Sequence, residues 1–152
     1  MADSSKRFEG DPRLTLNEGG ADLTFKGGQP VMDRGLENAA LISLYTEPGW
    51  FGNLFTRNPS QRIGSDFMAT QRQAITLDSI NDIRSAAESA LQWMLNDGIA
   101  SDITVRVSNP VSRKVQTVVL IKPVEGDIEL LLLTKYGDNW ISQKLDPAHL
   151  RL

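Results

Sequence analysis

The side chains that most often perform catalysis are scarce in this sequence. Its one histidine, His149, lies three residues from the end of the printed chain, and there is no cysteine. Zinc and other transition metals are usually held by sets of these two residue types, so such a site cannot be assembled here. An oxygen-only Mg²⁺ or Ca²⁺ site would need an acid-rich loop, which the sequence lacks. We therefore expect no metal and no cofactor.

Carboxylates offer the remaining route to catalysis. Glu37 and Glu47, with Asp66 nearby, could supply the acid pair that hydrolyses a glycosidic bond. Because the chain has 19 acidic residues, such pairs also arise by chance on a solvated surface, which is the interpretation we prefer. The glycine pairs at 19–20 and 27–28 lack the Gly-Lys-Ser/Thr ending of a phosphate-binding loop and are typical of turns. The residues therefore predict a protein that is not an enzyme.

A loop at positions 46–65 combines turn-forming residues with large aromatic ones. Glycine and proline interrupt regular structure, whereas Trp50, Phe51 and Phe55 favour burial away from water. A structureless segment of this length inside a compact domain is uncommon and tends to be functional. Two interpretations stay open. The rings fold back as a small core under the loop, or they anchor a partner protein, since aromatic residues are frequent interface hot spots.

Length and composition limit the class of protein. With 152 residues and 40% apolar side chains, we expect one domain with a single core, plus arms. The net charge of −3, the pI near 5.1 and the lack of a long basic run make nucleic acid and anionic membranes poor partners. No segment approaches the roughly 18 consecutive apolar residues of a membrane-spanning helix.

The N-terminal part of the chain, residues 1–30, is predicted to form an arm with a small hairpin. Alternating runs at 14–16 and 23–25, with a turn sequence of Asn-Glu-Gly-Gly between them, indicate the hairpin. The polar residues 1–12 favour disorder or ordering by a partner. Residues 26–30 are interpreted as a linker into the main domain.

Two helices are predicted next. Asp33 can cap the first, over about Gly35–Tyr45, whose apolar residues extend over more than one side. The second begins at Thr76 or Asp78 and ends at Gly98, where a glycine in the left-handed region belongs. The apolar arc of this second helix is roughly 200° wide. Its members are Leu77, Ile80, Ile83, Ala87, Ala90, Leu91, Met94 and Leu95, with Trp93 at the margin.

After the second helix the period of apolar residues changes from 3.6 to 2, which indicates strands. Three strands are predicted, around Ile103–Val107, Val115–Ile121 and Ile128–Leu133. Turns are expected at Asn109-Pro110 and at 123–127. This order of elements predicts an α+β fold, with two helices packed on one face of a three- to four-stranded, mainly antiparallel sheet.

The main domain is thus expected to span residues 31–136. Residues 137–152 show no usable period and are interpreted as an extended C-terminal arm. Within the second helix, Arg84 lies inside the apolar arc, one turn before Glu88. Two explanations stay open: an i,i+4 ion pair whose stem lies on the edge of the core, or a charge directed at a partner.

Several runs of residues, taken together, resemble the Mu-like phage baseplate wedge proteins. These are in turn similar to the sheath-initiator family of contractile tails. The resemblance covers about residues 31–135 and depends on the combination, because each run alone is a weak signal. The runs are 31–46, 49–53, 64–67, 72–84, Ala86-Ala87 and 93–100.

The resemblance implies a structural protein of a contractile tail, assembled in the host cytoplasm and resident in the tail baseplate of the virion. Its implied partners are the larger baseplate wedge subunit and the tail sheath protein, with central hub or tube proteins in addition. The first sheath ring would build on its sheet by strand addition. The broader family also carries a historical "lysozyme-like" label, and this label supplies the alternative function, a peptidoglycan hydrolase of a phage tail.

One departure from the broader family concerns the end of the long helix. That family has a Glu-Pro-Arg triplet there, which contacts the wedge core, whereas this chain reads Asn96-Asp97-Gly98, or Asp97-Gly98-Ile99 if the alignment shifts by one residue. Only the position of the contact is therefore carried over. Together with the aromatic loop and the other exposed candidates, the predicted partner-binding residues are Trp50, Phe51, Asn53, Phe55, Arg84, Trp93, Asn96, Asp97, Gly98 and Trp140.

Overall fold

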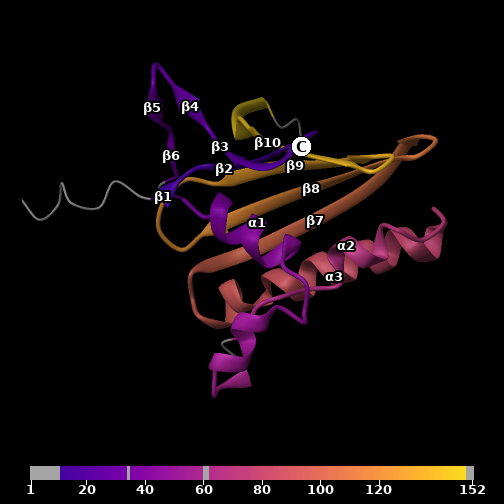
Figure 1. Cartoon of the computed structure of the whole chain (residues 1–152), viewed down its shortest axis with the longest axis horizontal. Helices are drawn as coiled ribbons and strands as arrows, with labels where there is room; N and C mark the ends of the chain where they lie inside the picture. The colour runs from indigo at the N-terminus through magenta and orange to yellow at the C-terminus, as the bar shows by residue number, and fades with distance from the viewer. Residues whose placement is uncertain (1–10, 34, 60–61, 150–152) are drawn as a thin grey trace, which may run out of the picture.

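Four long strands from the second half of the chain form the centre of the molecule. The computed structural model describes residues 11–33, 35–59 and 62–149. The strands form an antiparallel sheet in the order β10-β9-β8-β7, and helices cover one of its faces (Figure 1). The main elements are α1 (Glu37–Tyr45), α2 (Phe67–Thr70), α3 (Leu77–Asn96), β7 (Ala100–Val111), β8 (Lys114–Pro123), β9 (Glu129–Tyr136) and β10 (Asn139–Leu145). The predicted α+β fold is confirmed.

The ends of α3 follow from its sequence. Thr76 is the N-cap: its side chain accepts a hydrogen bond from the backbone of Ser79 at 3.2 Å, and the Ser79 hydroxyl accepts one from the backbone of Thr76 at 2.6 Å. This reciprocal pair is a capping box. At the other end Gly98 has φ +70°, and the N–H of Ile99 reaches back to the carbonyl of Met94 at 2.9 Å. Of the two predicted starts, Thr76 and Asp78, the structure has Thr76 as the N-cap, and the predicted stop at Gly98 is confirmed.

Helix α1 begins two residues later than predicted, at Glu37. Asp33 nevertheless supports its start from outside the helix. One carboxylate oxygen accepts from the N–H of Gly35 at 3.0 Å, and the other accepts from the N–H of Asn38 at 2.8 Å. Negative charge at this end also suits the helix dipole.

The hydrophobic core lies between the helices and the sheet. Strand residues that point toward the helices alternate with residues on the other face, as the pleat requires. Leu77 is an exception to the predicted apolar face of α3, because this first residue of the helix is 80% exposed. The buried apolar residues include Ala40, Leu44, Phe67, Ile83, Ala87, Leu91, Met94, Val105, Val115, Val119, Ile121, Leu131 and Leu133.

The turn between β7 and β8 lies at Ser112 and Arg113, so the prediction of a turn at Asn109-Pro110 is wrong. Asn109 and Pro110 belong to β7, at an irregularity of its pairing with β8. The side-chain amide of Asn109 donates to the carbonyls of Val111 and Lys114 at 2.8 and 2.7 Å. Asn109 therefore supports the turn from within the strand. Residue type alone does not show whether an asparagine forms a turn or supports a neighbouring one.

The predicted C-terminal arm is corrected by the structure, because residues Asn139–Leu145 form β10, the fourth strand of the sheet. Gly137, at φ +60°, makes the tight turn from β9. Trp140 then lies opposite Lys135 on the core face, and Ile141 lies on the other face. The strand is stabilised by its pairing with β9, and the local pattern of apolar residues does not reveal such pairing. After it comes a short 3₁₀-helix, Pro147–His149.

The N-terminal region forms two hairpins on a common stem (Figure 1). Three backbone hydrogen bonds join Arg13, Thr24 and Val31 where the hairpins branch. The first hairpin confirms the prediction. The expected linker at 26–30 is instead part of the second, whose turn is Gly27-Gly28. The strands are β1 (Asp11–Pro12), β2 (Leu14–Asn17), β3 (Gly20–Leu23), β4 (Phe25–Lys26), β5 (Gln29–Pro30) and β6 (Met32–Asp33).

The region called disordered or partner-ordered, 1–12, lies outside the described residues except for Asp11 and Pro12. In the part of the chain that the structure describes, no helix has the length and apolar character needed to cross a membrane.

Candidate protein-interaction site

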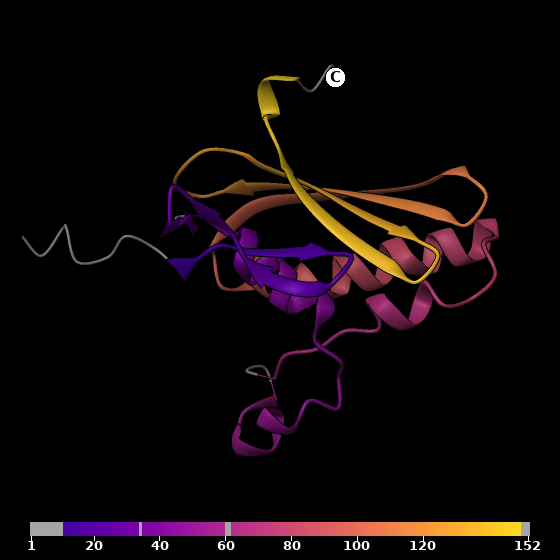
Figure 2. The ribbon, with the colours of Figure 1, turned by 45° about the horizontal axis from the view of Figure 1, so that its top comes forward.

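The segment between α1 and α2 projects away from the body of the molecule, beyond the helices (Figures 1 and 2). Its two ends are tied together at the base. The N–H of Ser65 donates to the carbonyl of Thr46 at 2.8 Å, and the Ser65 hydroxyl donates to the carbonyl of Leu44 at 2.9 Å. Gly64 has φ +127°, and a Cβ there would lie 2.6 Å from the carbonyl oxygen of Glu47. A larger residue would therefore force the base of the loop apart.

Asn53 braces the interior of this loop. Its amide nitrogen donates to the carbonyls of Ile63 and Pro48 at 2.6 and 3.1 Å, and its amide oxygen accepts from the N–H of Ile63 at 2.9 Å. The two bonds to Ile63 cross from one limb of the loop to the other, and the bond to Pro48 ties Asn53 to the limb that precedes it. The residue is 9% exposed, and the role that its hydrogen bonds indicate is support of the loop, while its predicted role as a partner contact stays a prediction. The loop is thus held in shape by a buried polar side chain rather than by an apolar core.

The tip supported in this way carries exposed apolar side chains. Residues Phe51–Phe55 form a short 3₁₀-helix, in which Phe51, Leu54 and Phe55 are 68%, 85% and 81% exposed. Trp50 is 43% exposed, and its indole lies against Gly52 and the ring of Phe51. The alternative that these rings fold back as a small core does not describe Phe51 or Phe55. We call Trp50, Phe51, Leu54 and Phe55 the apolar tip.

Leu54 is the residue of the tip that the sequence interpretation missed. It is the most exposed of the large hydrophobic residues that the structure describes. The prediction considered only the aromatic residues of the loop. The position of Leu54 between two predicted contacts, Asn53 and Phe55, could have identified it.

A groove of about 480 Å³ runs beside the base of this loop, between α1 and α3. Trp93 lies in its wall and is fixed by a 2.9 Å hydrogen bond from its indole N–H to the hydroxyl of Ser43. Ile42, which is 44% exposed, lines the same groove, and Asp97 contributes from the end of α3. Of the predicted partner-binding residues, the structure therefore brings Trp93 and Asp97 together. Asn96 and Gly98 are exposed beside Asp97.

The other two predicted residues lie elsewhere. Arg84 makes the i,i+4 ion pair with Glu88, at 3.9 Å and with both side chains about half exposed. Trp140 lies on the core face of β10, where its ring meets Tyr45 edge to face at a centroid distance of 5.4 Å. Packing therefore accounts for the position of Trp140, and a surface ion pair accounts for that of Arg84.

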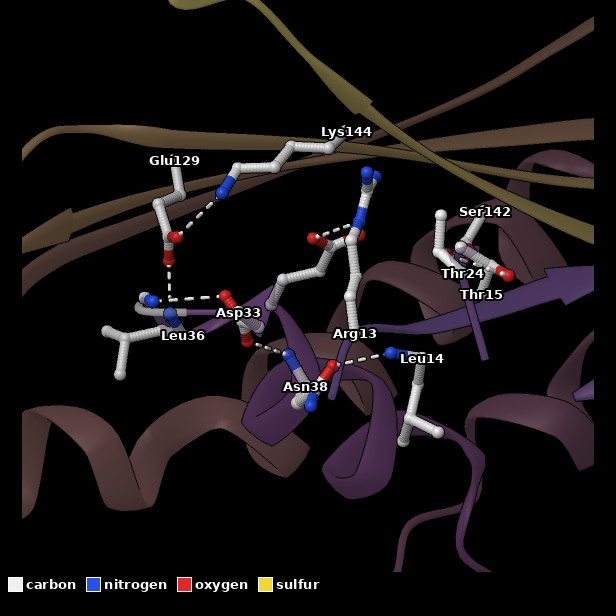
Figure 3. A network of polar contacts seen from close by, with 12 residues as sticks. Arg13, Leu14, Thr15, Thr24, Asp33, Leu36, Asn38, Glu129, Ser142 and Lys144 are labelled. Atoms are coloured by element: carbon white, nitrogen blue, oxygen red, sulfur yellow. Dashed lines mark hydrogen bonds and ion pairs between the residues drawn. The ribbon is translucent and has the colours of Figure 1, made fainter. Parts of the chain in front are cut away.

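A polar network attaches the N-terminal hairpins to α1 (Figure 3). Arg13 donates to both carboxylate oxygens of Glu37, at 2.9 and 3.2 Å. Asn38 accepts from the N–H of Leu14 at 2.9 Å and donates to the carbonyl of Pro12 at 2.8 Å. Burial raises the pKa of Glu37 above its ordinary value of 4.5, and Arg13 partly opposes this by hydrogen bonding and by its charge.

The same network extends to the sheet. Glu129 accepts from the N–H of Leu36 at 2.6 Å, and Lys144 of β10 donates to its other carboxylate oxygen at 3.2 Å (Figure 3). The Ser142 hydroxyl accepts from the N–H of Leu16 at 2.9 Å. Side chains of α1 and β10 therefore fix the hairpins, whereas Glu129 of β9 fixes the start of α1. None of these partners could be paired from local sequence.

Two of the three candidate acids each lie in an ion pair with an arginine. Glu37, one of the candidate acids, is 1% exposed and engaged with Arg13. Glu47 is a surface residue that pairs with Arg72 at 3.9 Å. No group of three or more histidine, cysteine or acidic residues that could hold a metal occurs in the described ranges. What the described surface does offer is a braced loop with an apolar tip, beside a groove with a mixed polar and apolar lining.

Comparison with known proteins adds the family. The model of the family described as "Phage protein GP46" matches residues 36–127, the stretch from α1 to the turn before β9. A Mu-like prophage FluMu protein gp46 of Haemophilus influenzae is 30% identical over 125 residues, covering 78% of this chain and 91% of that protein. The baseplate protein gp46 of Escherichia phage Mu is 28% identical over 112 residues, covering 63% and 75% respectively. No solved structure matches the chain. The chain belongs to the GP46 family of phage proteins.

Proposed function

We propose that this chain is a structural component of a contractile-tail baseplate, which joins the wedge and provides the surface on which the first sheath ring assembles. The relative from phage Mu is named a baseplate protein, and this supports placement in the tail baseplate of a virion. The observation that carries the proposal furthest is the apolar tip, held away from the body by Asn53 and the base of the loop. A monomer gains nothing from exposing these side chains, whereas an assembly can bury them.

The apolar tip is assigned to the larger wedge subunit. Burying a fully exposed leucine or phenylalanine side chain contributes about 1.5–3 kcal/mol, so the tip can supply most of the affinity of a moderate interface. Because Asn53 fixes the loop before any partner arrives, little ordering entropy is lost on binding. The groove beside Trp93, at the base of the same loop, provides a second contact with that partner.

The sheet edge at β7 is assigned to the sheath. In the described part of the chain, β7 pairs with β8 alone, and its other edge carries no strand. The opposite terminal strand, β10, has β2 beside it through the bond between Leu16 and Ser142. A free edge of 12 residues is long enough to receive an added strand from another chain. Irregular pairing at both ends of β7 restrains uncontrolled edge-to-edge association.

The proposal is tested by co-expressing the full chain with the baseplate wedge and sheath proteins of the same phage. We expect the wedge subunit to co-purify, and we expect sheath protein to be retained only when this chain is present. Deletion of the whole tip would also remove Asn53, so substitutions at the exposed positions are the cleaner perturbation. A chain that stays monomeric in the presence of both proteins would contradict the proposal, as would lysis of peptidoglycan by the purified chain in a turbidity assay.

A further inference from the structure

A second surface feature lies at the end of the sheet where the β7–β8 turn faces the start of α3 (Figure 2). It is an open pocket of about 680 Å³. Its walls come from the connection between α2 and α3, the β7–β8 turn and the β9–β10 turn. Three cationic side chains line it, Arg72, Arg113 and Lys135, with one acid, Asp138. We call it the basic pocket, and it shares no lining residue with the groove beside Trp93.

Hydrogen bonds hold the walls of the basic pocket together. The N–H of Gly137 donates to the carbonyl of Arg113 at 3.2 Å, which joins the two turns. The ammonium of Lys135 donates to the carbonyl of Gln71 at 3.0 Å and lies 5.5 Å from the centre of the Trp140 ring. Lys135 is therefore fixed by a neutral carbonyl and an aromatic face, and its positive charge is not neutralised by them.

The cations that line the pocket outnumber its one acid, and two of the three lie in no ion pair with a described residue. Among the described residues, neither Arg113 nor Lys135 has an acidic side chain within 4.0 Å. Arg72 has only the loose pair with Glu47, in which both side chains are more than 60% exposed. The remaining lining includes Gln73, whose amide can donate hydrogen bonds. Such a set of donors suits carboxylate oxygens, which accept several hydrogen bonds at once.

The backbone of Arg113 gives a second, independent indication. Its φ is +63°, and it is the one residue other than glycine with a positive φ in the described chain. Glycine adopts this conformation without the steric cost that a side chain brings. An arginine at this position places a guanidinium at the pocket, but its backbone conformation is strained. Such strain is typical of functional sites.

We propose that the basic pocket binds an acidic segment of a partner protein, whose aspartate or glutamate side chains pair with Arg72 and Arg113. The chain as a whole carries a charge of −3, so its long-range field repels an extended polyanion. A short acidic peptide can pair with the three cations of the pocket and extend little beyond it. Nucleic acid binding relies on many phosphate contacts, which would extend over the acidic remainder of the surface. This surface goes beyond the tip and the sheet edge.

The test is a titration of the full ¹⁵N-labelled chain with acetyl-tetraglutamate amide at low ionic strength, followed by NMR. We expect amide shifts around Arg72, Arg113 and Gly137, and a dissociation constant that rises with salt. Arg113→Gln should weaken binding about two- to fivefold, and the double variant with Arg72→Gln about tenfold, as for exposed ion pairs. Lys122→Gln, an exposed cation of β8 outside the pocket, is the matched control and should bind as the unaltered chain does.

Arg113→Gly separates binding from folding. It should leave the unfolding temperature unchanged or higher, because the strained backbone relaxes, and it should weaken the peptide as Arg113→Gln does. The proposal is overturned if the peptide does not bind, if its shifts lie outside the pocket, or if the double variant binds unchanged. Tighter binding of a short DNA duplex through the same residues would overturn it in favour of a nucleic acid.

Discussion

Truncation of the apolar tip at Leu54 and Phe55 tests the proposed docking loop most directly. The two side chains are 85% and 81% exposed, so Leu54→Ala with Phe55→Ala should change the free energy of unfolding by less than about 0.5 kcal/mol. In a complex that buries both, each truncation removes about four fifths of a contribution of 1.5–3 kcal/mol. The pair therefore costs about 3 kcal/mol of binding, which is a rise of roughly 150-fold in the dissociation constant.

The assay is a titration of the purified double variant against the wedge subunit, with thermal unfolding measured in parallel. Leu77→Ala is the matched control, because Leu77 is 80% exposed but lies at the start of α3, outside the loop. The control should bind as the unaltered chain does. Two results would refute the reasoning. If the double variant binds within about twofold of the unaltered chain, the tip does not dock. If its unfolding temperature falls like that of a core variant, the tip is part of the fold.

Three further outcomes follow from the structure. Asn53→Ala removes three hydrogen bonds within the loop, two of them to Ile63 on the other limb, and should cost about 1–3 kcal/mol of loop stability, seen as faster hydrogen exchange at Ile63. Unchanged exchange would show that Asn53 is not the brace. Gly64→Ala places a Cβ 2.6 Å from the carbonyl oxygen of Glu47 at φ +127°, so it should destabilise the chain by about 1–3 kcal/mol in urea unfolding, and a neutral result would contradict the assigned geometry. Because burial raises the pKa of Glu37, the native state holds that proton more tightly than the unfolded state. The unaltered chain should therefore lose stability relative to Glu37→Gln as the pH rises above 4.5, whereas a relative gain would mean that the bond to Arg13 outweighs burial.

Much of the candidate site could be located from sequence, but its working parts could not. The mixture of aromatic and turn-forming residues at 46–65 identified the loop, because unusual composition is a local property. Which side chains point outward depends on the brace by Asn53, whose partner across the loop, Ile63, lies ten residues further along the chain. The sequence interpretation accordingly named Asn53, which the structure buries, and omitted Leu54, which the structure exposes.

The basic pocket was also beyond local reasoning. Arg72, Arg113 and Lys135 come from three separate connections and elements, and none of them belongs to a basic run. They meet only because the β7–β8 and β9–β10 turns lie at the same end of the sheet as the start of α3. A charge count along the chain gives an acidic protein, whereas the folded surface concentrates cations at one place.

The sequence by itself determined the two main helices, three of the four long strands and the family. The capping pair at Thr76 and Ser79, the glycine at 98 and the change of apolar period after it act between near neighbours, so they can be recognised without a structure. Only the tertiary structure decided that residues 139–145 close the sheet as β10 and that Arg13 attaches the hairpins to Glu37. These contacts join residues far apart in the chain, and their stability comes from burial and pairing with partners that local sequence does not specify.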